Sequence, residues 1–449
     1  MNRKVFMVLA LAGTVALGAC GGRATNEVPS NTPGVSSNTP VASSNASGAS
    51  SNASGASCQV LRADLEWYGD NRARLNEMIA RVGECGGSGN VAEGAPVALL
   101  DWDNTVVRND VGDAQTYWML NNGKVLQPNN RDWTTMSTWL TDDAARALSA
   151  ACDALAEPGQ PLPTNTTAGR ACADEIVSIY DEGETIGDAT AFKGFNARRI
   201  EPRYAFAAQL LSGYTADEIK TFAKQARRQN IAAAEDTDQL VGSTEVTGWV
   251  RYYEQIVDLI DVLRANGFDV RIISASAQPV AQAWGEEIGI APEKVMGVIT
   301  MPDADGKLTP KLAGCGTDAE SITYLEGKRC RVNEEVFGID SSKAFAVADM
   351  DHRAAVGAGD SDTDVAFMLD ATELRLAINR NKTELMCYAY HNEDGKWLIN
   401  PMFIDPEDKK DEPYPCSTKG RILPNDEKGP LTESDGDVIA DQEDRVFGD

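Results

Sequence analysis

Four short apolar runs that alternate with helical stretches constrain the fold of this chain most strongly. The runs, each of strand length, are Pro96–Leu100, Phe268–Ile273, Arg353–Gly357 and Leu374–Ile378. Strands that alternate with helices predict an α/β fold in which helices cover both faces of a parallel sheet. Ligands bind such a sheet beyond the carboxyl ends of its strands. Asp101, Ser274 and Asp360 follow three of the four runs, so we expect polar side chains at that edge of the sheet.

The segment between the first two runs shows no repeating strand pattern. Helical stretches dominate there: Asp142–Leu155, Tyr204–Leu211 and Thr215–Arg228. We therefore interpret residues 108–247 as a helical cap. It is inserted into an α/β core that is made of residues 58–107 and 248–404.

The last segment, residues 405–449, is rich in Asp and Glu. Between Glu433 and Asp444 its acidic residues resemble a calcium-binding loop. However, Val438 stands where such a loop has a turn glycine, and no second copy occurs. We interpret the segment as a solvated acidic tail.

The beginning of the chain has the pattern of an export signal. Two basic residues precede an apolar run, Val5–Leu17, that is too short to span a membrane as a mature helix. The run leads into Leu17-Gly18-Ala19-Cys20, which resembles the lipobox of bacterial lipoproteins. The resemblance implies that residues 1–19 are a signal peptide and that Cys20 is lipidated, for example with palmitate.

The residues after this signal indicate a tether. Residues 20–57 are almost all small or polar and contain SNASGAS twice in tandem. Such a segment cannot bury enough apolar surface to fold, so we expect a disordered linker. The expected location is the cell envelope, with the lipid anchor as the only membrane contact. It would lie at the outer membrane, in the periplasm or on the cell surface.

The cysteine count fits an exported protein. Of nine cysteines, eight remain when Cys20 is set aside. An even number suggests disulfides, and among the 105 possible connectivities we favour nearest-neighbour pairs. These are Cys58–Cys85, Cys152–Cys172, Cys315–Cys330 and Cys387–Cys416. A metal cluster is the weaker interpretation, because no CxxC spacing occurs.

Charge and histidine content exclude several classes of function. The formal net charge of -27 repels phosphate backbones, so we expect no nucleic-acid partner. There are only two histidines, which argues against a His-rich zinc site and against Ser-His-Asp or Cys-His catalysis. Acid–base chemistry is therefore expected from carboxylates.

The first apolar run leads into Asp101-Trp-Asp103-Asn-Thr105, a DxDxT motif. Two carboxylates two residues apart at a strand end can share a site, one as nucleophile and the other as general acid and base. Asp349-Met-Asp351 also follows an apolar run, but Arg353 stands in the position of the threonine.

Three further motifs follow this one in a characteristic order. The chain has a serine after a later strand, then a lysine, then GDxxxD, and the matching residues are Ser274, Lys328, Asp360 and Asp364. This order resembles the haloacid dehalogenase-like (HAD) phosphohydrolases over roughly residues 96–380. The resemblance implies a Rossmann-like core. The position of the cap after the first motif is similar to that in the phosphoserine phosphatase branch. The DWDNT sequence and the segment Tyr204–Thr215 resemble those of bacterial phosphorylcholine phosphatases.

The resemblance implies a role for each motif residue. Asp101 would attack phosphorus and form an aspartyl phosphate, and Asp103 would protonate the leaving oxygen and then activate water. Ser274 and Lys328 would neutralise the phosphoryl oxygens. The implied cofactor is Mg²⁺. Its ligands would be Asp101, Asp360 and Asp364, with a backbone carbonyl from Asp103.

The expected substrate is a small phosphomonoester, for which Thr105 and Asp110 are candidate contacts. A Glu at the spacing of Asp110 binds the substrate amine in phosphoserine phosphatases, so an acid here suits a cationic, phosphorylcholine-like substrate. Four aromatic residues nearby fit either a choline cage or a helix core, and we favour the core. They are Tyr117, Trp118, Trp133 and Trp139.

Two other functions stay open at this point. A phosphotransferase or phosphomutase of the same superfamily would use the same residues. A non-catalytic surface lipoprotein would use an inactive fold for binding, but it has no need of the complete set of acids, serine and lysine.

Overall fold

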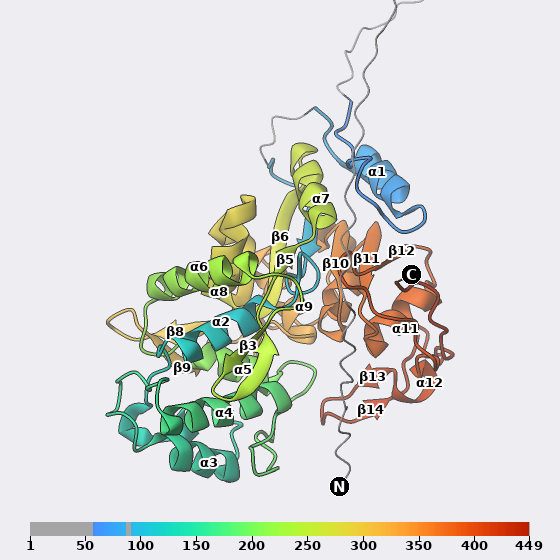
Figure 1. Ribbon diagram of the computed structural model, residues 1–449. Coiled ribbons are helices and arrows are strands. Elements are labelled where there is room, and N and C mark those ends of the chain that lie inside the picture. Colours follow the sequence, from blue (N-terminus) through green and yellow to red (C-terminus); the bar gives the residue numbers. More distant parts are fainter. Residues whose placement is uncertain (1–56, 87–90, 449) are drawn as a thin grey trace, which may run out of the picture. The chain divides into compact units, whose positions relative to one another are not determined.

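A computed structural model of the chain describes residues 57–86 and 91–448 (Figure 1). Its centre is a six-stranded sheet in which every pairing is parallel. From one edge to the other the strands are β12 (Trp397–Pro401), β11 (Leu374–Asn379), β10 (Val356–Gly359), β1 (Val97–Leu100), β6 (Asp269–Ala277) and β7 (Val295–Val298). The expected α/β fold with a parallel sheet is therefore confirmed.

The central strand β1 shows why these residues form a sheet that is covered on both faces. All four of its residues are buried, which explains a continuous apolar run rather than an alternating one. Val97 and Leu99 pack into one hydrophobic cluster, and Ala98 and Leu100 pack into another. Successive side chains of a strand point to opposite faces, so the two clusters lie on the two sides of the sheet.

Helices of the core cover the two faces. On the side of Val97 and Leu99 these are α9 (Glu326–Glu335), α10 (Val365–Asp370) and α11 (Thr383–His391). On the opposite side they are α1 (Asn71–Val82), α7 (Glu254–Ala265) and α8 (Gln278–Gly285).

The register of the sheet brings three strand ends together. Leu100, the last residue of β1, pairs with Ala358 of β10 on one side and with Ile272 of β6 on the other. The residues that follow these positions therefore meet at the carboxyl end of the sheet. This end carries the polar residues that the sequence places after the strands.

The segment between β1 and β6 is mainly helical. Its helices are α2 (Val111–Asn121), α3 (Asp142–Cys152), α4 (Thr167–Glu182), α5 (Pro202–Gln209) and α6 (Ala216–Ala232) (Figure 1). Local signals set their ends: Thr215 and Glu218 form a capping box at the start of α6, and Gly183 closes α4 with φ +70°. The sequence did not reveal a hairpin in this segment, made by β3 (Asp238–Val241) and β4 (Thr244–Thr247).

The helical segment leaves and rejoins the core at one place. Strand β2 (Val107–Arg108) precedes the segment and pairs antiparallel with β5 (Arg251–Tyr252), which follows it. A buried ion pair adds a second connection, since Arg198 Nη1 lies 2.8 Å from Glu384 Oε1 on α11. This helical segment is thus joined to the core at its two ends and through Arg198.

All four disulfides join the nearest-neighbour cysteines, as expected. They close loops of 15 to 29 residues. Another hairpin, β8 (Thr300–Pro302) with β9 (Leu308–Leu312), follows β7. Among residues 57–86 and 91–448, no helix combines the length and the apolar character that crossing a bilayer requires.

The interpretation of residues 405–449 as a solvated tail is wrong. The segment contains α12 (Cys416–Lys419), β13 (Arg421–Ile422) and β14 (Lys428–Gly429), and a disulfide joins it to α11. Tyr414 and Leu431 are fully buried in the core cluster of α10 and α11. Asp444 is 2% exposed and accepts a hydrogen bond from the hydroxyl of Tyr390 at 2.6 Å, so its carboxylate faces the core rather than a calcium ion.

Candidate active site

Three carboxylates meet at the carboxyl end of the sheet. Asp101 follows β1, Asp360 follows β10, and Asp364 lies at the end of a 3-10 turn, Asp362–Asp364. One oxygen from each lies within 4.8 Å of the others, and none of the three residues is more than 4% exposed. Like charges this close and this buried repel one another, so nearby cations stabilise the ionised form of the cluster.

Lys328 supplies the first of these cations. Its Nζ lies 2.5 Å from Asp101 Oδ1 and 2.6 Å from Asp364 Oδ1, and the side chain is completely buried. Burial alone lowers the pKa of Lys328, but the two carboxylates outweigh it and raise this pKa above its ordinary value. The third acid is paired separately, because Arg380 Nη1 lies 2.8 Å from Asp360 Oδ2.

Asp103 is held from two sides. Its Oδ1 accepts a hydrogen bond from Val111 N at 2.7 Å, and its Oδ2 accepts one from Ser276 Oγ at 2.8 Å and a longer one from Ser274 Oγ at 3.3 Å. Burial raises the pKa of Asp103 well above its ordinary value, and the neighbouring charge of Asp110 raises this pKa further. A carboxyl group with a raised pKa can hold a proton and release it to a leaving group.

Thr105 contacts two of the three carboxylates. Its Oγ1 donates a hydrogen bond to Asp360 Oδ1 at 3.2 Å and lies 3.5 Å from Asp101 Oδ2. The side chain is completely buried and is not among the residues that line the cavity above the cluster. This geometry makes Thr105 a residue that orients two carboxylates.

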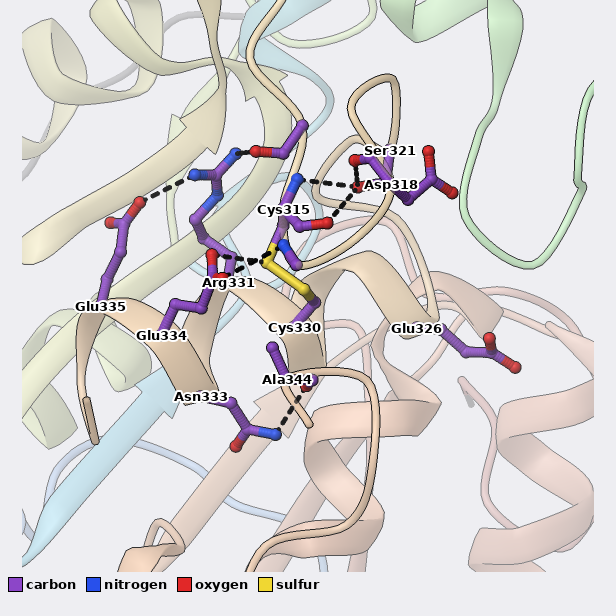
Figure 2. The surroundings of a disulfide bond; sticks show 12 residues. Cys315, Asp318, Ser321, Glu326, Cys330, Arg331, Asn333, Glu334, Glu335 and Ala344 are labelled. Atoms are coloured by element: carbon purple, nitrogen blue, oxygen red, sulfur yellow. Dashed lines mark hydrogen bonds and ion pairs between the residues drawn. A yellow bond between two sulfur atoms is a disulfide. The ribbon is translucent and has the colours of Figure 1, made fainter. Parts of the chain in front are cut away.

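The helix that carries Lys328 is positioned by a disulfide and a strained turn. Cys330, two residues after Lys328 on α9, is bonded to Cys315 of the preceding loop (Figure 2). The helix starts after Leu325, whose φ of +46° is strained for a residue with a branched side chain. Leu325 N donates to Thr363 O at 3.0 Å, which ties this turn to the loop that carries Asp364.

Polar contacts strengthen the same connection. Figure 2 shows Arg331 and Glu334 reaching from α9 toward the loop of Cys315. Arg331 Nη2 donates to Ala313 O at 2.7 Å, and Glu334 Oε1 accepts from Gly316 N at 3.2 Å. Both sulfurs near Glu334 are in the disulfide, so this group is not a metal site.

A cavity of about 220 Å³ opens above Asp101 and Asp103. Its floor comes from the core and its walls come from α2, α5 and the end of α4. Besides Asp101, Asp103 and Asp360, its charged and phenolic lining residues are Asp110, Tyr180, Glu201, Arg203, Tyr204, Tyr324, Asp362, Arg380 and Lys382. Ser276 and Asp360 complete the polar floor, while Lys328 and Ser274 lie below the surface of the cavity.

Asp110 lines this cavity but already has hydrogen-bond partners. It caps α2, and its Oδ1 accepts from Gly112 N at 2.6 Å and from Asp113 N at 3.1 Å. Burial raises the pKa of Asp110, although these backbone donors oppose the shift. The four aromatic residues considered for a choline cage, Tyr117, Trp118, Trp133 and Trp139, are all in the hydrophobic core and none lines the cavity.

Sequence reasoning missed several residues of this site. Ser276 lies two residues after Ser274 and so points to the same face of β6. Arg380 directly follows β11, the same position after a strand that singled out Asp101. Its position directly after a strand could therefore have indicated Arg380. The motif pattern used for prediction, however, contains no residue after β11.

The donor set fits a hard divalent cation. Asp101, Asp360 and Asp364 offer oxygen atoms only, which are the ligands that Mg²⁺ prefers. The carboxyl groups of Asp101 and Asp103, the second with a raised pKa, both line one cavity. This arrangement can perform displacement at phosphorus with proton transfer.

Comparisons with known proteins agree with this geometry. Residues 180–369 match the model of a family described as haloacid dehalogenase-like hydrolase. This segment includes Ser274, Lys328, Asp360 and Asp364. The described residues form an α/β fold with a six-stranded parallel sheet, and residues 180–369 resemble a haloacid dehalogenase-like hydrolase domain. No curated protein matches the chain closely enough to count as a relative.

Three solved structures are similar to this chain. A conserved protein of unknown function from Anaerococcus prevotii DSM 20548 covers 76% of this chain and 94% of its own, at 21% identity and a TM-score of 0.55. A protein of unknown function from Bordetella pertussis Tohama I covers 68% and 98%, at 17% identity and a TM-score of 0.41. A substrate-bound phosphoserine phosphatase covers 63% and 86%, at 13% identity and a TM-score of 0.28. The first of these shows that the fold is shared.

Replacement of Lys328 tests the electrostatics of the site. In metal-free buffer with EDTA, Lys328→Met should lower the free energy of unfolding by about 3–5 kcal/mol, because two buried carboxylates lose their cation. The measurement is urea denaturation followed by circular dichroism. As a control, Lys294→Met should cost less than about 1 kcal/mol, because Asp269 keeps its contact with Arg271 at 2.8 Å. Equal losses in the two variants would contradict this account of the site.

Proposed function

We propose that this protein is a Mg²⁺-dependent phosphomonoesterase that hydrolyses a small phosphate ester through an aspartyl phosphate on Asp101. One observation carries the proposal. The carboxylates of Asp101 and Asp103 form the floor of a single cavity, the first held by Lys328 and the second by Ser276. A nucleophile and a separate proton donor at the same cavity are what cleavage of a phosphate ester needs.

The reaction divides into two displacements. In the first, an oxygen of Asp101 bonds to phosphorus, the ester P–O bond breaks, and Asp103 gives its proton to the leaving alcohol oxygen. In the second, Asp103 takes a proton from water as the water oxygen bonds to phosphorus. The bond between Asp101 and phosphorus then breaks, which releases inorganic phosphate and restores both carboxyl groups.

The other residues would hold the metal ion and influence the charge of Asp101. Asp101, Asp360 and Asp364 would hold the ion, together with the backbone carbonyl of Asp103. When bound, Mg²⁺ would neutralise charge on the phosphoryl oxygens as a Lewis acid. Burial raises the pKa of Asp101 well above its ordinary value and the charge of Asp364 raises it further, whereas Lys328 opposes this shift and favours the anion.

Burial also argues against a non-catalytic binding role. Taking carboxylates out of water costs several kcal/mol per ion in proteins, even after relaxation. A binding module gains nothing from placing three such groups around one point. A phosphotransferase would use the same chemistry, with an acceptor other than water.

A cationic alcohol part, as in phosphorylcholine, is the second candidate for the substrate. The observation that favours it is the position of Asp110, a carboxylate on the cavity wall. A bound ammonium would offset the desolvation of this group.

We also propose that the protein is exported and lipid-anchored to the cell envelope. Cys20, the residue to be lipidated, lies outside the residues that the structure describes, as do the signal peptide and most of the tether. Support comes from the four disulfides, which persist in oxidising compartments.

Replacement of the nucleophile tests the proposed reaction. Asp101→Asn should lower kcat for p-nitrophenyl phosphate by roughly three orders of magnitude or more, because an amide cannot form the acyl phosphate. Asp351→Asn, in the exposed DxD triplet, is the matched control and should leave kcat unchanged. Substantial turnover by a folded Asp101→Asn protein would exclude the assignment.

Metal removal tests the cofactor. Dialysis against EDTA should abolish hydrolysis of p-nitrophenyl phosphate, and added Mg²⁺ should restore it. Excess Ca²⁺ should inhibit, because it favours longer bonds and higher coordination numbers. Full activity after exhaustive chelation would rule out the Mg²⁺ scheme while leaving the fold assignment intact.

Replacement of Cys20 tests the location. Cys20→Ala should move the protein from the membrane fraction to the soluble fraction, measured by immunoblotting after ultracentrifugation of cells that express the full chain. A variant that still pellets like the wild type would refute the lipid anchor.

A further inference from the structure

Gln115 is a buried amide without hydrogen bonds on the wall of the cavity. It is 1% exposed and lines the cavity from α2. Neither its Nε2 nor its Oε1 has a partner among residues 57–86 and 91–448. Two other buried glutamines, Gln127 and Gln209, also have an unpaired Oε1, but the Nε2 of each donates a hydrogen bond, to Asp153 Oδ1 at 3.0 Å and to Pro310 O at 2.9 Å.

Such a side chain is unfavourable for the protein by itself. A buried donor or acceptor that finds no partner costs about 1–3 kcal/mol, and an apolar residue of the same shape would avoid that cost. The rest of the cavity wall includes apolar residues, such as Leu211 and Val280, so an apolar side chain would fit there. A polar side chain at this position therefore points to a ligand that pairs with it.

The helix geometry places Gln115 one turn along α2 from the residue that contacts Asp103. Val111 N, at the start of α2, contacts Asp103. Gln115 lies four residues later on the same face, about 6 Å further along the helix axis. Gly112 and Thr116, its neighbours at i−3 and i+1, also line the cavity. A phosphate ester held at Asp101 would thus direct its alcohol part toward Gln115.

We propose that Gln115 determines specificity by binding a hydroxyl group in the alcohol part of the substrate. This inference rests on the proposed phosphomonoesterase function. A hydroxyl both donates and accepts, so one group can pair with Oε1 and with Nε2. A trimethylammonium group has neither an N–H nor a lone pair and leaves both amide atoms unpaired. The preferred class of substrate is therefore the phosphate ester of a polyol.

Asp110 is compatible with the same ligand. Its Oδ1 is already paired with two backbone N–H groups, while its second oxygen can accept from another hydroxyl. Arg203 and Arg380, which line the cavity as well, provide positive charge near this wall. A neutral polyol therefore meets hydrogen-bonding groups here, and no cation is needed.

The test compares two substrates and two glutamines. In Gln115→Leu, kcat/KM for glycerol 3-phosphate should fall about tenfold, mainly through a higher KM. The kcat/KM for p-nitrophenyl phosphate, which has no hydroxyl group, should change less than about twofold. The urea midpoint of unfolding should stay the same or rise, because an unpaired amide has been removed. Gln115→Met provides a second variant of similar volume.

Gln209→Leu is the matched control. This glutamine is buried in the same cap but makes a hydrogen bond and does not line the cavity. Its loss should lower the urea midpoint and leave the ratio of the two kcat/KM values unchanged.

Three results would overturn the inference. Equal losses on both substrates together with lower stability in the Gln115 variants would show a structural role. A wild-type preference for phosphorylcholine over glycerol 3-phosphate that the Gln115 variants retain would favour recognition of a cation. If the wild-type protein hydrolysed none of the three esters, the proposed function itself would fail and this inference with it.

Discussion

The contact of one lysine with two buried carboxylates is the interaction on which the rest of this structure depends. Lys328 has no exposed surface, and its Nζ lies within 2.6 Å of both Asp101 and Asp364. Desolvation of three charges is costly, and it is offset only when geometry and additional hydrogen bonds are good. The elements that carry these residues, β1, α9 and the turn after β10, must therefore be held in place to within a few tenths of an ångström.

Several features of the chain provide this precision. The Cys315–Cys330 disulfide and the strained turn at Leu325 fix the position of α9. Gly359 is needed for a different reason. A Cβ atom there would lie 2.5 Å from the Cβ of Asp364, so only glycine lets the loop fold back against β10. The strain at Leu325 is the kind that persists where surrounding structure over-determines a backbone conformation.

The sequence predicts those structural features that a single local pattern of residues determines. Buried parallel strands are continuous apolar runs, so a parallel sheet, four of its six strands and the polar residues after three of these could be predicted. Contacts between distant segments could not. The partner of Asp444 is Tyr390, 54 residues earlier, and nothing in an acidic segment indicates a buried phenol at that distance. The lack of hydrogen bonds at Gln115 likewise depends on what surrounds it in three dimensions.

Helix α2 carries both the N–H group that contacts Asp103 and the glutamine proposed to bind the substrate. Its first N–H groups hold Asp103 and Asp110, and its next turn presents Gln115 to the cavity. A Cβ on Gly112 would lie 2.8 Å from Ser276 Oγ, so the close approach of α2 to β6 depends on this glycine. Any shift of α2 would also move the hydrogen bond that Val111 N donates to Asp103. Under the proposals made above, the core sets the chemistry, and the helix proposed to bind the substrate also holds the proton donor.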